Sequence, residues 1–334
     1  MSQQPSPSGV MMPKVVDLFL TNKVPCAVLA VVMLSSVYWI DMLFGSLGVL
    51  ALILVVFGVL LHLVVPGLFA LVTLGGGLKY SLQTGAIAAI LLLLFTSGSI
   101  GTAVVFFLLF VVLPSFSARL LQQQGMGQAA WLLALVLCSG VGFAMVAGAG
   151  GQSVESLVQQ QFQPVFDEML ASIPPGATAE VASVQHLQAV MVKVFPGFFI
   201  LSLCLIWWSD VLLARKLAIH YGFYQGNTDG VLAFALPKVL VYVLLILLPF
   251  ANMAEGNVQY LALGAAIVLA GLLAVQGVMV AHAWLKNRNM VNTIVVMYVL
   301  LFFWFGVVVM FALIGLLDVW FNFRRNFGSA TGEK

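Results

Sequence analysis

Residues 294–317 form an unbroken apolar run, IVVMYVLLFFWFGVVVMFALIGLL, that contains no ionisable side chain. An α-helix needs only roughly 20 such residues to cross a bilayer. Hydrophobic residues make up 63% of the chain and charged residues only 7%, so similar runs recur along most of its length. In lipid, backbone N–H and C=O groups must be paired within their own segment, which favours helices. The sequence therefore predicts an all-α polytopic membrane protein.

The apolar runs predict a bundle of about nine transmembrane helices, within a range of about eight to ten. They occupy residues 24–40, 46–74, 81–95, 100–121, 128–147, 194–217, 231–250, 258–284 and 291–317. The second run exceeds one straight crossing and contains His62 and the helix-breaking pair Pro66-Gly67. It is expected to be either one broken helix or a span followed by a re-entrant piece.

The runs divide the chain into three segments. Residues 1–23, rich in Pro and Ser at the start, are expected to be disordered with a short interfacial helix. Residues 24–217 would form a six-span membrane core, and residues 218–334 would add C-terminal spans and an interfacial C-terminal helix. An insert at 148–193 has apolar residues at near-helical spacing, which predicts an extracytoplasmic amphipathic helical hairpin. A structural cap is the favoured role of this hairpin, and a gate or lid is the alternative.

The distribution of basic residues predicts the orientation in the membrane. If the run 46–74 crosses once, most of them fall on one side of the predicted bundle: Lys14, Lys23, Lys79, Arg119, Arg215, Lys216, Lys286 and Arg288. The positive-inside rule makes that side cytoplasmic, so the N-terminus is expected in the cytoplasm of a bacterial cell, with the spans in the inner membrane. Nine spans would put Arg324 and Arg325 on the opposite side. Either the span count is wrong by one, or the last helix ends in the cytoplasmic interface.

Several classes of function are not expected. The chain has no HExxH or GxSxG motif and no Cys/His cluster, so we expect no enzyme, no metal site and no cofactor. Its basic residues are scattered, unlike the stripe that binds nucleic acid. Cys26, Cys138 and Cys204 each lie inside an apolar run and are expected to act as small buried hydrophobic residues. The expected partners are the lipid bilayer, other membrane proteins and a small-molecule ligand.

Ionisable residues inside a span are candidates for function because their burial in lipid is costly. The candidates for ligand binding, with the adjacent helix breaker, are His62, Pro66, Lys79, Asp210 and His282. For Asp210, an anchor at the membrane interface is favoured over a functional role, because Trp207, Trp208, Arg215 and Lys216 are its neighbours. For His62, a neutral ring bonded to a carbonyl freed by the helix break is favoured over a proton relay or a ligand.

The most distinctive string in the sequence is GLLDVWFNFRR at 315–325. Asp318 and Arg325 are two helical turns apart on one face, and Trp320 suits the headgroup region. Asp318, Trp320, Arg324 and Arg325 are therefore candidates for membrane anchoring, which is favoured, or for docking a partner or locking the bundle.

This ending, together with Gln276-Gly277, the Lys286-Asn287-Arg288 turn and Ala235-Leu236-Pro237, resembles the YybS-like bacterial membrane proteins of unknown function. Pro66-Gly67, Gly85 and residues 114–121 resemble the same pattern in the first half of the chain. That family is distantly similar to the substrate-binding (S) subunits of energy-coupling-factor transporters. The resemblance implies a transport-related role, with a small-molecule binding or permeation site among the first six spans. The alternative is a non-catalytic membrane scaffold that docks partners through its C-terminal helix.

Overall fold

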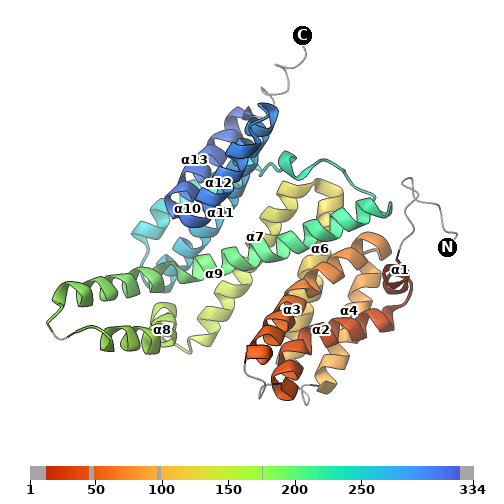
Figure 1. The fold of residues 1–334 in the computed structure, drawn as a ribbon, viewed down its shortest axis with the longest axis horizontal. Coiled ribbons are helices and arrows are strands. Elements are labelled where there is room, and N and C mark those ends of the chain that lie inside the picture. The colour runs from red at the N-terminus through yellow and green to blue at the C-terminus, as the bar shows by residue number, and fades with distance from the viewer. Residues whose placement is uncertain (1–12, 45–48, 96–98, 175, 324–334) are drawn as a thin grey trace, which may run out of the picture. The chain divides into compact units, whose positions relative to one another are not determined.

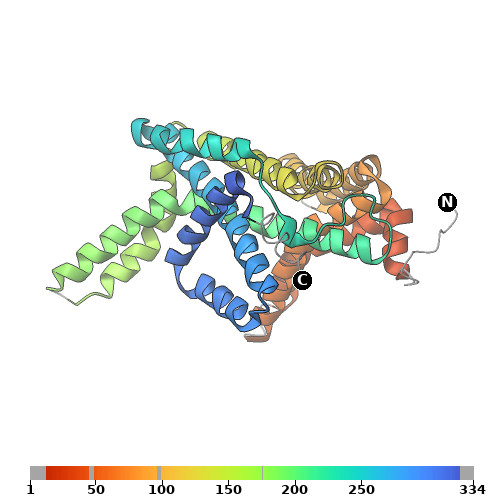
Figure 2. The ribbon, with the colours of Figure 1, turned by 90° about the horizontal axis from the view of Figure 1, so that it is seen from above.

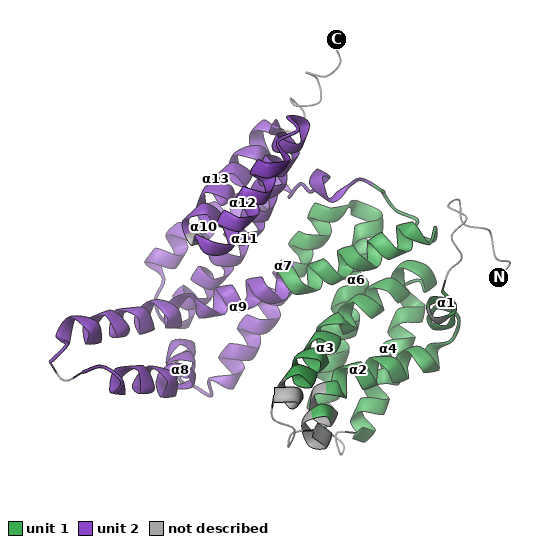
Figure 3. Cartoon of the chain, viewed as in Figure 1, with its two compact units in different colours: residues 1–133, 205–228 green, residues 134–204, 229–334 purple. Residues whose placement is uncertain are grey.

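The structure is a computed structural model that describes residues 13–44, 49–95, 99–174 and 176–323. Throughout these ranges the regular elements are helices, without a strand, and long apolar helices dominate (Figures 1 and 2). The predicted all-α membrane class is therefore confirmed. The chain forms two compact units (Figure 3), which comprise residues 1–133 with 205–228, and residues 134–204 with 229–334.

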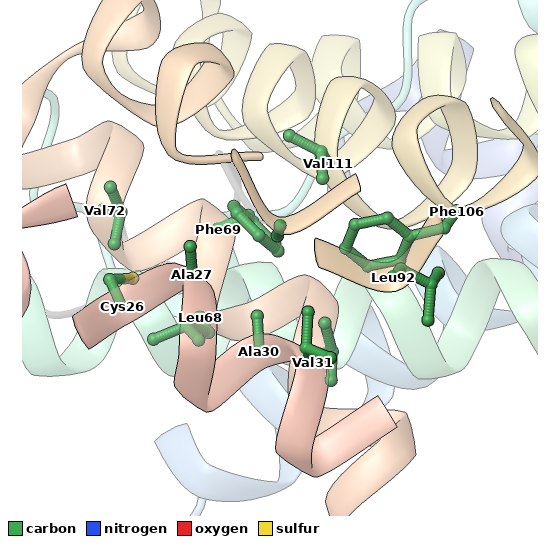
Figure 4. Packing of buried hydrophobic residues seen from close by; sticks show 12 residues of the cluster. Cys26, Ala27, Ala30, Val31, Leu68, Phe69, Val72, Leu92, Phe106 and Val111 are labelled. Atoms are coloured by element: carbon green, nitrogen blue, oxygen red, sulfur yellow. The ribbon is translucent and has the colours of Figure 1, made fainter. Parts of the chain in front are cut away.

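Unit 1 is built on the N-terminal helices. They are α1 (Lys14–Thr21), α2 (Lys23–Phe44), α3 (Val49–Gly76), α4 (Leu78–Phe95), α5 (Ile100–Phe106) and α6 (Leu113–Gln124). Its core joins small residues of α2, among them Ala27 and Ala30, to larger side chains of other elements, such as Phe69 and Phe106 (Figure 4). Small residues let neighbouring helices approach closely in a membrane, where van der Waals contact drives helix association.

Unit 2 is built around the 32-residue helix α11 (Gly256–Asn287), which packs against several of its other helices. These are α8 (Val154–Ala171), α10 (Lys238–Met253), α12 (Val291–Phe303) and α13 (Phe305–Phe321). Two further helices, α7 (Met126–Gly148) and α9 (Thr178–His220), each contribute residues to both units.

The number of spans is smaller than the sequence predicts when only long helices are counted. Within the described residues, six helices are long and apolar enough to cross a membrane, or seven if the bent pair α12 and α13 is one span. Two shorter apolar helices, Lys23–Ser36 and Lys238–Met253, also coincide with predicted spans. The predicted span 231–250 is wrong at its start. A short 3-10 turn (Val231–Ala233) and Pro237 precede the helix, since proline favours an extended residue before it.

In two other predicted spans, the helix breaks in the structure differ from those expected from the sequence. The run 46–74 is not interrupted at Pro66, because α3 continues through this residue to Gly76 as one helix. The run 291–317 is instead interrupted at Trp304, two residues before Gly306. Trp304 separates α12 from α13, and the two helix axes differ in direction by 117°.

The insert 148–193 contains two helical segments joined by a turn, namely α8 and the first part of α9. They lie side by side in Figures 1 and 2. The amide of Gln188 donates to the side-chain oxygen of Gln163 over 3.1 Å, and the rings of Phe162 and Phe195 lie 4.8 Å apart. The helical hairpin is therefore present. The buried residue Val154 packs with Tyr260 of α11, so part of its apolar face is covered by protein.

Candidate functional site

Asp210 is the buried carboxyl group that most clearly stands out in unit 1. It lies on α9 and is only 9% exposed. None of the described residues forms a hydrogen bond with its Oδ2 atom. An unpaired carboxylate in a low-dielectric interior is costly, by several kcal/mol in real proteins. The sequence favoured an anchor at the membrane interface for Asp210, whereas this environment is interior.

Gly67 of α3 makes room for Asp210. A Cβ atom on Gly67 would lie 3.3 Å from the Cβ of Asp210 and 3.6 Å from its Cγ, closer than most such contacts. Gly67 precedes Gly76, the last residue of α3, by about 14 Å along the helix axis. That distance is roughly half of the ~30 Å hydrocarbon core of a bilayer. Asp210 therefore faces α3 close to the middle of the candidate membrane span Ile53–Gly76.

Pro66, the neighbour of Gly67, is buried inside the helix. Because proline has no N–H, it cannot donate to the carbonyl of His62 four residues earlier. His62 itself is bonded to another helix: its Nδ1 lies 3.2 Å from the carbonyl oxygen of Leu34 on α2. The oxygen can only accept, so Nδ1 carries the hydrogen. The carbonyl partner of His62 thus comes from α2 and not from a break in α3.

An aromatic row extends from His62. The ring of His62 meets Phe110 edge to face at 5.1 Å, and Phe110 meets Trp207 in the same manner at 5.7 Å. Trp207 precedes Asp210 by three residues on α9, so both lie on neighbouring positions of one helix face. The row therefore connects α3 and the segment 107–112 with the turn of α9 that carries Asp210.

Phe110 belongs to a π-helical segment, Phe107–Val112, inserted between α5 and α6. Such segments are rare and frequently occur at functional sites. Val111 of the same segment fills the place of a missing side chain on α4, because a Cβ on Gly85 would lie only 2.1 Å from its Cγ1 atom. The π segment was missed by sequence reasoning, since its residues FLLFVV carry no local signal for it.

Buried hydroxyl groups connect the helices around this region. The Oγ atoms of Ser81 on α4 and Ser115 on α6 lie 2.8 Å apart, and Ser81 also donates to the carbonyl of Phe69 on α3. Both serines are fully buried. Hydrogen bonds of this kind hold helices together in lipid, where no water competes for them.

The basic neighbours of Asp210 on α9 have different environments. Arg215 is buried: its Nη2 donates to the carbonyl of Asn227 over 2.7 Å, and its guanidinium lies 5.4 Å from the ring of Tyr224. Lys216 is exposed. Arg215 therefore fastens the loop after α9, a role that the sequence did not indicate.

The candidates Lys79 and His282 are not among the residues described in contact with Asp210. Lys79 is exposed in the first turn of α4, after Gly77, whose φ is +85°. His282 belongs to unit 2, where its Nδ1 lies 2.9 Å from the hydroxyl of Tyr298 and thereby joins α11 to α12.

Asp318 of α13 is part of a buried polar chain. The amide of Gln276 donates to its Oδ2 over 2.8 Å, and the backbone N–H of Phe323 donates to its Oδ1 over 2.9 Å. The Oε1 atom of Gln276 accepts the backbone N–H of Leu236 over 2.8 Å. Asp318 is only 3% exposed, so its carboxylate is turned into the protein.

Of the remaining C-terminal candidates, the structure describes only Trp320. Trp320 is 42% exposed at the end of α13. Arg324 and Arg325 lie outside the described residues, as does the expected approach of Arg325 to Asp318.

Comparison with known proteins places the chain in a family. No match was found among curated proteins or among solved structures. The pattern of one family, described as "Predicted membrane protein (DUF2232)", matches residues 42–319, which is most of the chain. This range includes the helices that carry His62, Asp210 and Asp318. The protein therefore belongs to the predicted membrane protein family DUF2232.

Proposed function

We propose that this protein has a transport-related role, with a small-molecule binding or permeation site among the helices of unit 1. The observation that supports it is the carboxyl group of Asp210, which is buried against Gly67 and has an oxygen without a hydrogen-bond partner among the described residues. Ionisable residues at such depth are rare and commonly mark ligand or ion pathways. Asp210 would supply the ionisable group of the site.

The aromatic row and the π segment support the same location. Ligand sites in membrane proteins lie mostly between helices, with many apolar and aromatic contacts and a few polar groups that set orientation. His62, Phe110 and Trp207 supply aromatic surface from three elements, and Asp210 supplies the charge. Helix irregularities at Pro66 and at residues 107–112 add backbone carbonyls that lack their usual α-helical partners.

The wider setting of the proposal comes from the resemblance to YybS-like proteins and, through them, to substrate-binding subunits of energy-coupling-factor transporters. In this proposal the protein lies in the bacterial inner membrane with a cytoplasmic N-terminus, as the positions of its basic residues favour. In this proposal the protein binds or passes its ligand without catalysing a reaction.

Ligand-dependent thermal stabilisation tests the proposal. The purified protein in detergent is screened with vitamins, amino acids and polyamines, because a ligand that binds the folded state raises the melting temperature. We expect at least one compound to raise it in the wild type and in Asp167→Asn, which changes an exposed carboxylate on α8. The same compound should produce no rise in Asp210→Asn. An equal rise in Asp210→Asn, or no rise with any compound in the wild type, contradicts the proposal.

A scaffold that docks partners through its C-terminal helix is the second candidate. It is supported by Trp320 and Phe321, whose side chains are 42% and 64% exposed beside the buried Asp318. In that case, Trp320→Ala with Phe321→Ala should remove proteins that co-purify from native membranes, while Asp210→Asn should not. Retention of every such protein by the double variant contradicts the scaffold role.

A further inference from the structure

The helices α12 and α13 together cover a run that the sequence predicts as one span, but their geometry does not suit a crossing. α12 has 13 residues and α13 has 17, which correspond to about 20 Å and about 26 Å. At the observed difference of 117° in direction, the two outer ends are about 24 Å apart. One straight helix over the same residues would measure about 46 Å. The bent pair is shorter than the ~30 Å hydrocarbon core, whatever its tilt.

Contacts with α11 fix the course of α12. His282 lies five residues before the end of α11, and Tyr298 lies seven residues after the start of α12, yet their side chains are 2.9 Å apart. Leu285 and Met297 also belong to one buried cluster. The two helices therefore run back along each other after the turn at residues 288–290. If α11 crosses the membrane, α12 re-enters it.

The break at Trp304 then turns the chain around. The helix α12 is about 20 Å long. Because of the bend, α13 runs back by about 12 Å when its length is projected on the axis of α12. Measured along the axis of α12, the two ends of the pair are thus separated by only about 8 Å. Such a separation cannot bring the end of α13 to the opposite surface of the bilayer.

The residues at the break suit lipid and not water. Phe302, Phe303 and Trp304 are 83%, 79% and 62% exposed in the structure. The turn between α11 and α12 has the contrasting sequence Lys286-Asn287-Arg288-Asn289. A loop in water at Trp304 would expose three large aromatic side chains to solvent, whereas a bend within the membrane keeps these side chains out of water.

Tight contacts with α11 hold α13 in its returned position. A Cβ on Gly315 would lie 1.9 Å from the carbonyl oxygen of Leu273, so the backbones are in contact. The hydrogen bond from Gln276 to Asp318 continues this contact toward the end of α13.

From these observations we infer that α12 and α13 form a re-entrant hairpin, whose bend at Trp304 does not reach the opposite face of the membrane and whose two ends lie at the same face. The end of α13 then lies on the side of Lys286 and Arg288. That side agrees with the positive-inside rule, which favours a cytoplasmic position for basic residues such as Arg324 and Arg325.

Thiol labelling of single-cysteine variants tests the hairpin. In a parent with Cys26, Cys138 and Cys204 replaced by alanine, a single cysteine is placed at Met290, at Phe303, at Glu255 or after Lys334. A membrane-impermeant maleimide is added to intact spheroplasts or to inverted vesicles. We expect Met290→Cys and the C-terminal cysteine to react from one side and Glu255→Cys from the other. Phe303→Cys should react from neither side.

Two outcomes overturn the inference. One is labelling of the C-terminal cysteine from the side of Glu255→Cys, and the other is reaction of Phe303→Cys at the rate of Glu255→Cys. If the parent without cysteines does not accumulate, fusions of a fluorescent protein to the native chain replace the labelling. The reporter is placed after Asn289 in one fusion and after Lys334 in another. It folds only in the cytoplasm, so equal fluorescence supports the hairpin and opposite results contradict it. Neither assay depends on Asp210 or on a ligand.

Discussion

Gly277 of α11 and Gly315 of α13 lie in direct backbone contact. A Cβ atom on Gly277 would lie 1.9 Å from the carbonyl oxygen of Phe311 and 2.9 Å from the backbone nitrogen of Gly315. No flexible side chain could move aside to relieve such a clash, because the opposing atoms belong to the main chain. Small residues at helix crossings in membranes serve this close approach.

Gly315→Ala is therefore expected to destabilise the protein, by about 1–3 kcal/mol or more, since overpacking forces the helices apart. Gly277→Ala should act in the same way, and the double variant should lose less than the sum of the two, because both changes separate the same pair of helices. Thermal unfolding in detergent measures the effect. Gly140→Ala is the matched control, because no atom lies within 4 Å of its added Cβ. Equal melting temperatures for Gly315→Ala and Gly140→Ala would contradict the crossing.

The hydrogen-bonded chain from Leu236 through Gln276 to Asp318 predicts that variants of Asp318 lower the melting temperature to different extents. Asp318→Ala leaves the buried amide of Gln276 without its acceptor, which costs about 1–3 kcal/mol. Asp318→Asn retains a carbonyl oxygen that can accept one of the two bonds, so its melting temperature should lie between those of Asp318→Ala and wild type. Glu180→Ala, a change at an exposed position, serves as the control. A melting temperature for Asp318→Ala that equals the wild type would show that the chain of bonds contributes nothing to stability.

The close contact of Val111 with Gly85 predicts that a second substitution, at Val111, restores stability lost by a substitution at Gly85. Gly85→Ala would place a methyl group within 2.1 Å of Val111 Cγ1, so it should lower the melting temperature. Adding Val111→Ala removes the two nearest clashing atoms, Cγ1 and Cγ2, and should recover part of the loss. Gly101→Ala, whose Cβ would meet nothing within 4 Å, should leave stability nearly unchanged. Failure of Val111→Ala to recover any stability in the Gly85→Ala background would contradict the observed packing of the π segment.

Two side chains of α11 hold the base of the 148–193 hairpin. The hydroxyl of Tyr260 donates to the carbonyl of Val192, and the side-chain oxygen of Asn257 accepts the N–H of Val154 over 2.7 Å. Tyr260→Phe with Asn257→Ala should therefore speed amide hydrogen exchange in the first turns of α8 by about thirtyfold, since the two lost bonds together contribute on the order of 2 kcal/mol. Tyr242→Phe, at a half-exposed position on α10, is the control. Unchanged exchange in the double variant would show that other contacts hold the hairpin.

The sequence predicted the helical membrane class because lipid leaves few alternatives for an apolar backbone. It did not predict where helices break. Pro66 indicated a break, yet α3 continues, because a helix tolerates one missing N–H more readily than lipid tolerates a fully unpaired stretch. Near Trp304 the glycine Gly306 is a weak local signal, and because a single glycine is tolerated inside a helix, the break could not be predicted from it.

The candidate site was predictable only in part. Asp210 was selected as an ionisable residue in a span, but its position opposite Gly67 depends on packing between α3 and α9 that no spacing reveals. For Asp318 the local pattern suggested Arg325, two turns away. A partner among the described residues is Gln276, which is distant in sequence and lies on a different helix. Contacts between distant segments are invisible to periodicity within one helix.

The π segment also changes how the span 100–124 should be read. One series of its buried positions advances by three or four residues, except for a step of five across the segment: Ala103, Phe106, Val111, Pro114, Ala118 and Leu121. A helical wheel with 3.6 residues per turn drawn through the whole span would thus assign one of its two halves to the wrong face. Deleting a single residue between Phe106 and Val111 would restore a uniform helix and rotate α6 by about 100° relative to α5.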